Sequence, residues 1–320
     1  MNWTDYQDVY WVYDHHVAPM AERLMADCPG LRASMALDAT EASKTMDSVL
    51  DICRWLLSEG AGRGALLVGM GGGITTDLCG FAASVYMRGI RFGFIPTTLL
   101  AQVDAAIGGK NGVNLDGYKN MVGVIREPEF VWILPETLTT LPPREWRNGA
   151  AELLKTFLID NTGGCYEKAV RQMASPVIPD RIGDLITAAG AVKRRIVAED
   201  LYERGLRKKL NLGHTFAHAI ERLSSGAVSH GEAVAMGIQL AATLSARLGL
   251  CEKALPARLR ADFAAAGLPV ECPFPLQELS ATMRKDKKAA DGKVDFVLIR
   301  DIGDVVIVPL TVSEVMEILR

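Results

Sequence analysis

Short apolar runs alternate with amphipathic stretches in the first part of this chain. The apolar runs Val9–Val12, Ala65–Val68 and Phe92–Ile95 are predicted to be strands. The stretches Ser43–Glu59 and Thr75–Tyr86 have the periodicity of helices. Strands that alternate with helices are typical of an α/β domain, so we predict a mostly parallel sheet with helices packed on it.

From Arg144 onward the pattern changes to long helical stretches. The predicted helices are Glu145–Leu158, Ile182–Asp200, Thr215–Leu223, Glu232–Leu248 and Leu255–Ala266, and a strand pair is predicted at Val294–Ile299 and Asp304–Val308. The segment Leu141-Pro142-Pro143 separates the two patterns, because its prolines interrupt both helices and strands. We therefore predict an α/β N-terminal domain over residues 1–142 and a mainly α-helical C-terminal domain over residues 143–320.

The composition and net charge limit the kinds of partner that the chain is expected to bind. The net charge is −3, with 49% hydrophobic and 23% charged residues, so a nucleic-acid or membrane partner is not expected. An anionic ligand must then be held by a local cluster of cations. The six cysteines are scattered without a CxxC pair, which favours thiols in a reducing compartment. Neither a secretory signal nor a membrane span is recognised, and a cytoplasmic location is expected.

A glycine-rich turn follows the second predicted strand. Ala65–Val68 runs into Gly69-Met-Gly-Gly-Gly73, and a helix is predicted from about Thr75. Backbone N–H groups at such a turn can hold a pyrophosphate, and glycine lets the phosphate approach the chain. The pattern departs from G-x-G-x-x-G because Ile74 occupies the last glycine position. On this pattern alone, a nucleotide site and a tight turn without ligand remain equal alternatives.

Three of the five histidines fall in one short window. His214 and His218 are four residues apart, so a helix places them on one face, and His230 begins the next predicted helix. Imidazole is a common zinc ligand, and residue types alone would pair His214 with His218. A carboxylate should complete the site, and the candidates are Glu152, Glu221 and Glu232. His15 and His16 are expected at the surface.

Several charged residues lie in polar segments. Lys110, Lys119 and Asn120 are predicted on glycine-rich loops that could bind phosphate, although solvated turns would look the same. Asp104 interrupts the apolar run 99–107, where an unpaired carboxylate would be costly, so we expect it to have a partner. The charged segment 203–211 could simply be a solvated helix end, and for 286–288 charge alone favours that interpretation.

In order along the chain, these segments resemble the dehydroquinate synthase family. The resemblance covers Val9 to Val308, and its motifs are GGGITTDLCGFAASVYMRGI, IPTTLLAQVDAAIGGKNGVNLDGYKNMVG, LPPREWRNGAAELLK, KRRIVAEDLYERGLRKKLNLGHTFAHAIE, HGEAVAMG and MRKDKKAADGK. It implies an enzyme that uses NAD and one divalent metal, zinc or cobalt. Asn111, Ala217 and the pair Thr75-Thr76 depart from the family pattern without removing a charged or ligating group.

The resemblance also implies roles for individual residues. Glu152, His214 and His230 would hold the metal, which moves His218 to the substrate side. NAD would contact Glu41, Lys44, Gly73, Ile74, Thr75, Thr76, Asp77, Thr97, Thr98, Lys110, Lys119, Leu138, Thr139 and Thr140. The substrate would contact Asp104, Lys110, Asn120, Lys155, Lys193, Glu203, Arg207, Asn211, His218 and Lys287. Arg88 would reach the phosphate from the partner subunit of a homodimer.

The chemistry of the family accounts for these residue types. Its substrate, 3-deoxy-arabino-heptulosonate 7-phosphate, carries a carboxylate, a phosphate and several hydroxyls. Lysine and asparagine suit the phosphate, whereas Lys193 and Arg207 suit the carboxylate. Two alternatives remain: a related cyclase for a sugar phosphate without the carboxylate, such as sedoheptulose 7-phosphate, and a metal-dependent polyol dehydrogenase. Retention of Arg207 and Asn211 favours the carboxylate-bearing substrate.

Overall fold

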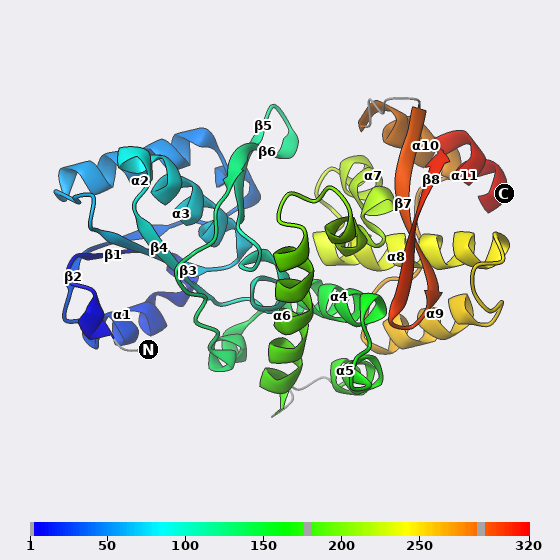
Figure 1. Ribbon diagram of the computed structural model, residues 1–320, viewed down its shortest axis with the longest axis horizontal. Coiled ribbons are helices and arrows are strands. Elements are labelled where there is room, and N and C mark those ends of the chain that lie inside the picture. The colour runs from blue at the N-terminus through cyan, green and yellow to red at the C-terminus, as the bar shows by residue number, and fades with distance from the viewer. Residues whose placement is uncertain (1–2, 176–180, 287–291) are drawn as a thin grey trace. The chain divides into compact units, whose positions relative to one another are not determined.

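The structure, a computed structural model, describes residues 3–175, 181–286 and 292–320. The chain divides into two compact units, Met1–Leu141 and Pro142–Arg320 (Figure 1). The N-terminal unit contains β1 (Val9–Asp14), α1 (Ala18–Ala26), β2 (Leu31–Leu37), α2 (Met46–Ser58), β3 (Leu66–Gly71), α3 (Gly73–Val85), β4 (Arg91–Pro96), β5 (Lys110–Leu115) and β6 (Tyr118–Ile125). Short helical turns lie at Trp3–Asp5, His15–Val17, Glu41–Ser43, Tyr86–Arg88, Ala101–Ala105 and Pro135–Thr140.

The main sheet of this unit has the strand order β2-β1-β3-β4, and every neighbouring pair is parallel, as predicted. Side chains of β1 alternate between two apolar clusters. Tyr10 and Val12 pack with α2 and α3, while Val9 and Trp11 pack on the other face with α1. A parallel sheet covered on both faces buries all its central strands, which explains their short apolar runs.

The hairpin β5–β6 corrects one prediction. Lys110 is the first residue of β5, and Lys119 and Asn120 lie in β6, so none of the three is on a glycine-rich loop. Gly112 and Gly123 face each other across the hairpin, and a Cβ on Gly123 would lie 2.8 Å from the Cα of Gly112. These glycines permit close approach of two strands. Because β6 is largely exposed, it has no apolar alternation that would reveal it.

The C-terminal unit is mainly helical. It contains α4 (Pro143–Ile159), α5 (Cys165–Met173), α6 (Ile182–Glu199), a 3-10 turn at Leu206–Asn211, α7 (His214–Ser224), α8 (His230–Arg247), α9 (Leu255–Ala265), α10 (Leu276–Asp286), β7 (Lys293–Asp301), β8 (Asp304–Thr311) and α11 (Val312–Leu319). Helix α8 lies at the centre of the unit, where it packs against α4, α7, α9 and α11 (Figure 1). The antiparallel β7–β8 hairpin was predicted, but the chain continues into α11 after it.

Local signals explain where the helices of this unit begin. Pro143 occupies the first turn of α4, where a missing backbone donor costs nothing. Gly213 precedes α7 with a φ of +78°, a left-handed conformation that favours glycine. Ser229 and Glu232 form a capping box at the start of α8, so His230 begins that helix as predicted.

Candidate functional site

The glycine-rich turn joins β3 to α3 at the carboxyl end of the parallel sheet. Gly72 is the N-cap of α3 and provides no side-chain cap for the first backbone N–H groups. A Cβ at Gly71 would lie 2.4 Å from Thr75 Oγ1, and one at Gly73 would lie 3.1 Å from the Cβ of Ala105. The glycines therefore let the chain pack closely at this turn, and the uncapped N–H donors at the start of α3 fit a pyrophosphate group.

A polar cluster beside this turn includes several residues that the family resemblance assigns to NAD. Lys44 is buried, and its Nζ lies 2.5 Å from Asp77 Oδ2 and donates to Asn120 Oδ1 at 2.6 Å. Glu41 accepts a hydrogen bond from Asn114 Nδ2 at 2.8 Å and lies 3.9 Å from Lys119 Nζ. The cluster thus brings together the turn Glu41–Ser43 with Lys44 after it, α3 and the β5–β6 hairpin.

Asn114 joins the parts of this cluster and was missed by sequence reasoning. Its backbone N–H donates to Lys44 O at 2.9 Å, and its side chain accepts from the backbone N–H of Asn120 at 3.0 Å. That contact holds Asn120 at a φ of +54°, a conformation that asparagine tolerates better than most residues. The only signal in the sequence was its place in the motif GGKNGVN.

The other residues of the N-terminal unit that the family resemblance assigns to NAD or the substrate lie on several segments. Thr97 is buried just after β4, and Thr98 is partly buried. Asp104 is half-buried in the turn Ala101–Ala105. Ile74 is partly buried in the first turn of α3, where Thr75 and Thr76 are fully buried. Leu138 is buried and Thr139 and Thr140 are exposed at the end of Pro135–Thr140, which Gln102 anchors by donating to Leu134 O and Thr137 Oγ1.

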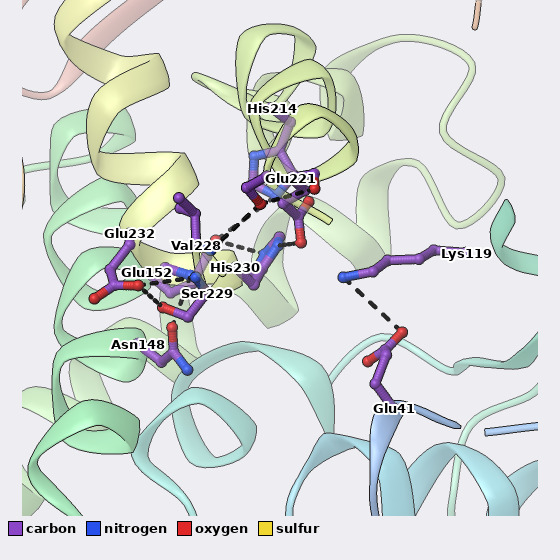
Figure 2. Close-up of polar contacts among 12 residues, drawn as sticks. Glu41, Lys119, Asn148, Glu152, His214, Glu221, Val228, Ser229, His230 and Glu232 are labelled. Atoms are coloured by element: carbon purple, nitrogen blue, oxygen red, sulfur yellow. Dashed lines mark hydrogen bonds and ion pairs between the residues drawn. The ribbon is translucent and has the colours of Figure 1, made fainter. Parts of the chain in front are cut away.

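Glu152, His214 and His230 come together in the C-terminal unit. One ligand atom from each lies within 4.8 Å of the others. Glu152 Oε1 is 3.6 Å from His214 Nε2 and 3.4 Å from His230 Nε2 (Figure 2). Neither oxygen of this fully buried carboxylate has a hydrogen bond of regular geometry. A buried carboxylate that faces two imidazole nitrogens is a donor set that fits a divalent cation such as zinc.

Glycine contacts set the separation of the three helices that carry this group. A Cβ at Gly231, next to His230, would lie 2.4 Å from Asn148 O on α4, one turn before Glu152. The backbone N–H of Gly231 donates to Asn148 Oδ1 at 2.9 Å. On the other side of α8, a Cβ at Gly237 would lie 2.2 Å from Gly213 O, next to His214. Close packing at these two points places both histidines beside Glu152.

The electrostatics of the group follow from burial and from neighbouring charges. Burial would raise the pKa of Glu152, but Lys155 and the two imidazoles hold it well below the usual range. Burial and Lys155 lower the pKa of His214 to about 3. Burial would also lower the pKa of His230, yet Glu152 and Glu221 raise it to about 10. These directions favour a charged Glu152 and a neutral His214, the forms that bind a cation.

The segment Asp200–Asn211 contains three residues that the resemblance assigns to the substrate, namely Glu203, Arg207 and Asn211. Asp200 accepts from the backbone N–H groups of Arg204, Gly205 and Arg207 at 2.7–3.1 Å, which holds the segment in one conformation. Arg207 is buried, and its Nη1 donates to Leu201 O at 2.6 Å, so the solvated helix end that the charges also suggested is wrong here. Asn211 donates to Glu203, which has a φ of +57°. Asp200 was missed because a turn acceptor has no sequence signature of its own.

The other assigned residues have varied surroundings. Lys155 and Lys193 are buried on α4 and α6, and Lys155 forms an ion pair with Glu152. His218 is exposed on α7, one turn after His214, and their rings are 5.6 Å apart. Arg88 is exposed in a left-handed turn after α3, with a φ of +70°. Lys287 lies outside the described residues.

A second group of potential ligand atoms, Asp14, His15 and His16, lies at the surface of the N-terminal unit. Asp14 caps the turn that contains both histidines and accepts from the His16 backbone N–H at 3.0 Å. The surface position of the two histidines was predicted. All six cysteines lie in the described ranges and are free thiols. In the same ranges, none of the helices combines the length and hydropathy of a membrane span.

Known proteins resemble this chain over most of its length. Residues 34–148 match the family described as 3-dehydroquinate synthase N-terminal, and residues 149–289 match 3-dehydroquinate synthase C-terminal. A 3-dehydroquinate synthase of Acidithiobacillus ferrooxidans is 43% identical over 307 residues, which are 92% of this chain and 83% of that protein. One from Pyrococcus abyssi is 46% identical over 82% of this chain and 77% of its own length.

Solved structures resemble the fold closely. A 2-epi-5-epi-valiolone synthase from Streptomyces hygroscopicus with bound NAD+ and Zn2+ has a TM-score of 0.90 and 30% identity, covering 98% of this chain and 91% of its own. A 2-deoxy-scyllo-inosose synthase with carbaglucose-6-phosphate, NAD+ and Co2+ has a TM-score of 0.89 and 24% identity, covering 100% and 92%. A probable glycerol dehydrogenase from Sinorhizobium meliloti shares only the fold, at 14% identity and a TM-score of 0.65, covering 98% and 89%.

Proposed function

Because this chain belongs to the 3-dehydroquinate synthase family, we propose that it converts 3-deoxy-arabino-heptulosonate 7-phosphate to 3-dehydroquinate and phosphate. In this proposal the chain is a carbon–oxygen lyase and cyclase of the shikimate pathway that depends on NAD and one divalent metal, zinc or cobalt. The observation that carries the proposal is the buried carboxylate of Glu152 facing the Nε2 atoms of His214 and His230. The NAD+ and Zn2+ bound by a relative of 30% identity support the same two cofactors.

In this proposal the two units bind different ligands. NAD binds to the N-terminal unit at the glycine-rich turn and the cluster around Lys44, while the metal and the carboxylate end of the substrate bind to the C-terminal unit. Bound NAD would supply a reversible hydride transfer at a carbinol carbon of the substrate, and a metal held by Glu152, His214 and His230 would polarise the oxygen of that carbinol. Three protein ligands are the number typical of a catalytic zinc site.

Residues of the C-terminal unit orient the substrate. Arg207 and Lys193 bind the substrate carboxylate, and Asn211 contributes a hydrogen bond. Asp200 keeps Arg207 in place through its backbone, and Leu201 O anchors the guanidinium. A buried guanidinium that is already positioned loses little conformational entropy when it binds an anion.

The phosphate is assigned to Lys110, Asn120 and Lys287, with His218 on the metal-binding unit available for proton transfer. After oxidation of the carbinol, the neighbouring C–H becomes acidic, and phosphate leaves by β-elimination. The proton passes to the departing phosphate itself or to His218, whose exposed ring lies one turn from a metal ligand. Return of the hydride, ring opening and an internal aldol step complete the carbocycle.

We also propose a homodimer, located in the cytoplasm, in which Arg88 serves the site of the partner subunit. Its position in an exposed left-handed turn of the N-terminal unit supports a role outside the packed core. Sedimentation of the purified protein tests the oligomeric state directly.

Turnover with catalytic amounts of NAD tests the reaction class. We expect many molecules of phosphate to be released per molecule of NAD, without accumulation of NADH, because the hydride returns in each cycle. Phosphate release and absorbance of NADH are followed in the same sample, with zinc or cobalt added to chelator-treated protein. NADH formed in proportion to product would contradict the cyclase assignment and favour a metal-dependent polyol dehydrogenase.

The variant Arg207→Lys tests the substrate. Lysine keeps the charge but lacks the two parallel hydrogen bonds of a guanidinium, each worth roughly 1.5–3 kcal/mol. We expect kcat/KM for the heptulosonate phosphate to fall about tenfold or more. Sedoheptulose 7-phosphate, which lacks the carboxylate, should react poorly with the parent enzyme and lose little further in the variant. Equal losses for both substrates would favour the related cyclase, an alternative that the structural similarity to 2-epi-5-epi-valiolone synthase keeps open.

A further inference from the structure

Both imidazoles of the metal group have an oxygen partner at the ring nitrogen that points away from Glu152. His214 Nδ1 lies 3.2 Å from the backbone carbonyl oxygen of Leu212. His230 Nδ1 lies 3.5 Å from Glu221 Oε1. Each ring therefore presents its Nε2 to Glu152, and the two rings differ in the partner behind them: a neutral carbonyl for one and a carboxylate for the other.

Glu221 reaches His230 from the same helix that carries His214. It lies two turns after His214 on α7, so the two residues share a side of the helix. Its side chain is only 8% exposed, and Figure 2 shows it directed at the ring of His230. Helix α7 therefore contributes His214 to the metal group and, through Glu221, contacts the ring of His230.

We propose that Glu221 is a positioning residue for the metal: it accepts the Nδ1–H of His230, which fixes the ring orientation and leaves the Nε2 lone pair for the metal. The inference rests on the proposed metal site. The contact of 3.5 Å between His230 Nδ1 and Glu221 Oε1 is within ion-pair distance. Carboxylates behind ligating histidines recur in metal sites, where they strengthen the ring as a donor.

The geometry separates this role from direct ligation. The sequence left Glu152, Glu221 and Glu232 open as the carboxylate ligand. Glu221 lies on the far side of the His230 ring from Glu152, so it does not share the position between the two Nε2 atoms. Glu232 accepts from the Ser229 backbone N–H at 2.8 Å and from Ser229 Oγ at 2.7 Å. Its carboxylate caps α8 and makes no such contact with the ring.

Glu232 also supplies a matched control, because it is a partly buried carboxylate two residues from the same histidine. Glu221→Gln keeps the shape and an acceptor oxygen but removes the charge, whereas Glu221→Ala removes the acceptor as well. Glu232→Gln removes a similar charge without changing the partner of the ring. The three variants and the parent are loaded with zinc, and the dissociation constant is measured by competition with a chromophoric chelator.

We expect zinc affinity to fall about tenfold in Glu221→Gln and up to about 100-fold in Glu221→Ala. Glu232→Gln should stay within about twofold of the parent in affinity, and its side-chain oxygen can still accept from Ser229 and cap α8. In cobalt-loaded protein, the visible absorption bands should shift in both Glu221 variants and remain unchanged in Glu232→Gln. A merely structural role of Glu221 would leave these bands in place.

Parental affinity and unchanged cobalt bands in Glu221→Gln would overturn the inference. Equal losses in Glu221→Gln and Glu232→Gln would also overturn it, because they would show a general effect of charge. Absence of metal binding by the parent protein would instead contradict the proposed function itself. Circular dichroism of each variant confirms folding, and Glu221→Gln, which preserves shape, decides the question if Glu221→Ala does not fold.

Discussion

Glu152→Gln should abolish metal binding and reduce the catalytic rate by about 1000-fold or more, since a metal acting as Lewis acid contributes several kcal/mol to the reaction. Glutamine preserves the side-chain volume but removes the negative charge that balances a divalent cation. Metal content per chain and the rate of phosphate release measure the two effects. A variant that binds metal with parental stoichiometry and affinity would show that the ligand assignment is wrong.

The same substitution should also destabilise the protein independently of the metal. Lys155 is only 1% exposed, and Glu152 is its ion-pair partner. Removing one partner of a buried ion pair is strongly destabilising and costs about 3–5 kcal/mol. Urea unfolding of chelator-treated parent and variant isolates this effect. Glu167→Gln, which breaks a more exposed contact with Arg258 on other helices of the unit, is the control and should cost less than about 1 kcal/mol.

Gly231→Ala should weaken metal binding although it removes no ligand. The added methyl group would lie 2.4 Å from Asn148 O and 2.5 Å from its Cα, and these backbone atoms cannot move away without shifting α4 or α8. Overpacking of this kind costs about 1–3 kcal/mol. Since His230 precedes Gly231 and Glu152 follows Asn148 by one turn, the shift separates two ligands, and we expect metal affinity to fall at least about tenfold.

Gly62→Ala is the control for this substitution, because a Cβ at Gly62 meets no atom within 4 Å. Metal affinity and urea unfolding are measured for both variants. Parental metal affinity in Gly231→Ala, with lower stability, would mean that other contacts fix the distance between Glu152 and His230.

The elements that could be predicted from the sequence are those with a buried apolar face. The runs that became β1, β3 and β4 are apolar because both faces of the parallel sheet are covered. The helices α4, α6 and α8 have long periodic patterns and clear starts. The β5–β6 hairpin has neither, since its polar strand β6 is exposed and its glycines resemble a loop. Strand β2, at a sheet edge, alternates between partly buried and exposed positions, a strand signal that sequence reasoning missed.

The metal group shows what residue types alone cannot predict. The four-residue spacing of His214 and His218 predicts one helical face, which is correct, but both Nε2 contacts with Glu152 belong to His214 and His230. Spacing within one helix cannot show which residues of α4 and α8 lie beside it. Residue types left Glu152 as one of three candidate carboxylates, and the resemblance selected it together with His230, because it compares whole motifs. Neither route identified Asp200, Asn114 or the contact of Glu221 with His230, because these residues act through backbone groups or through a neighbouring ring.

Glu152 on α4 is far along the chain from His214 on α7 and His230 on α8. In the unfolded chain Glu152 meets the two histidines only at the cost of closing a long loop, so a cation bound by all three stabilises the folded state alone. At a free concentration 100 times the dissociation constant, such a ligand adds about 2.7 kcal/mol to the free energy of unfolding. With the proposed metal site, the resistance of the C-terminal unit to heat and proteolysis would follow the supply of metal. A cell that lacks the metal would lose the protein to degradation as well as its activity.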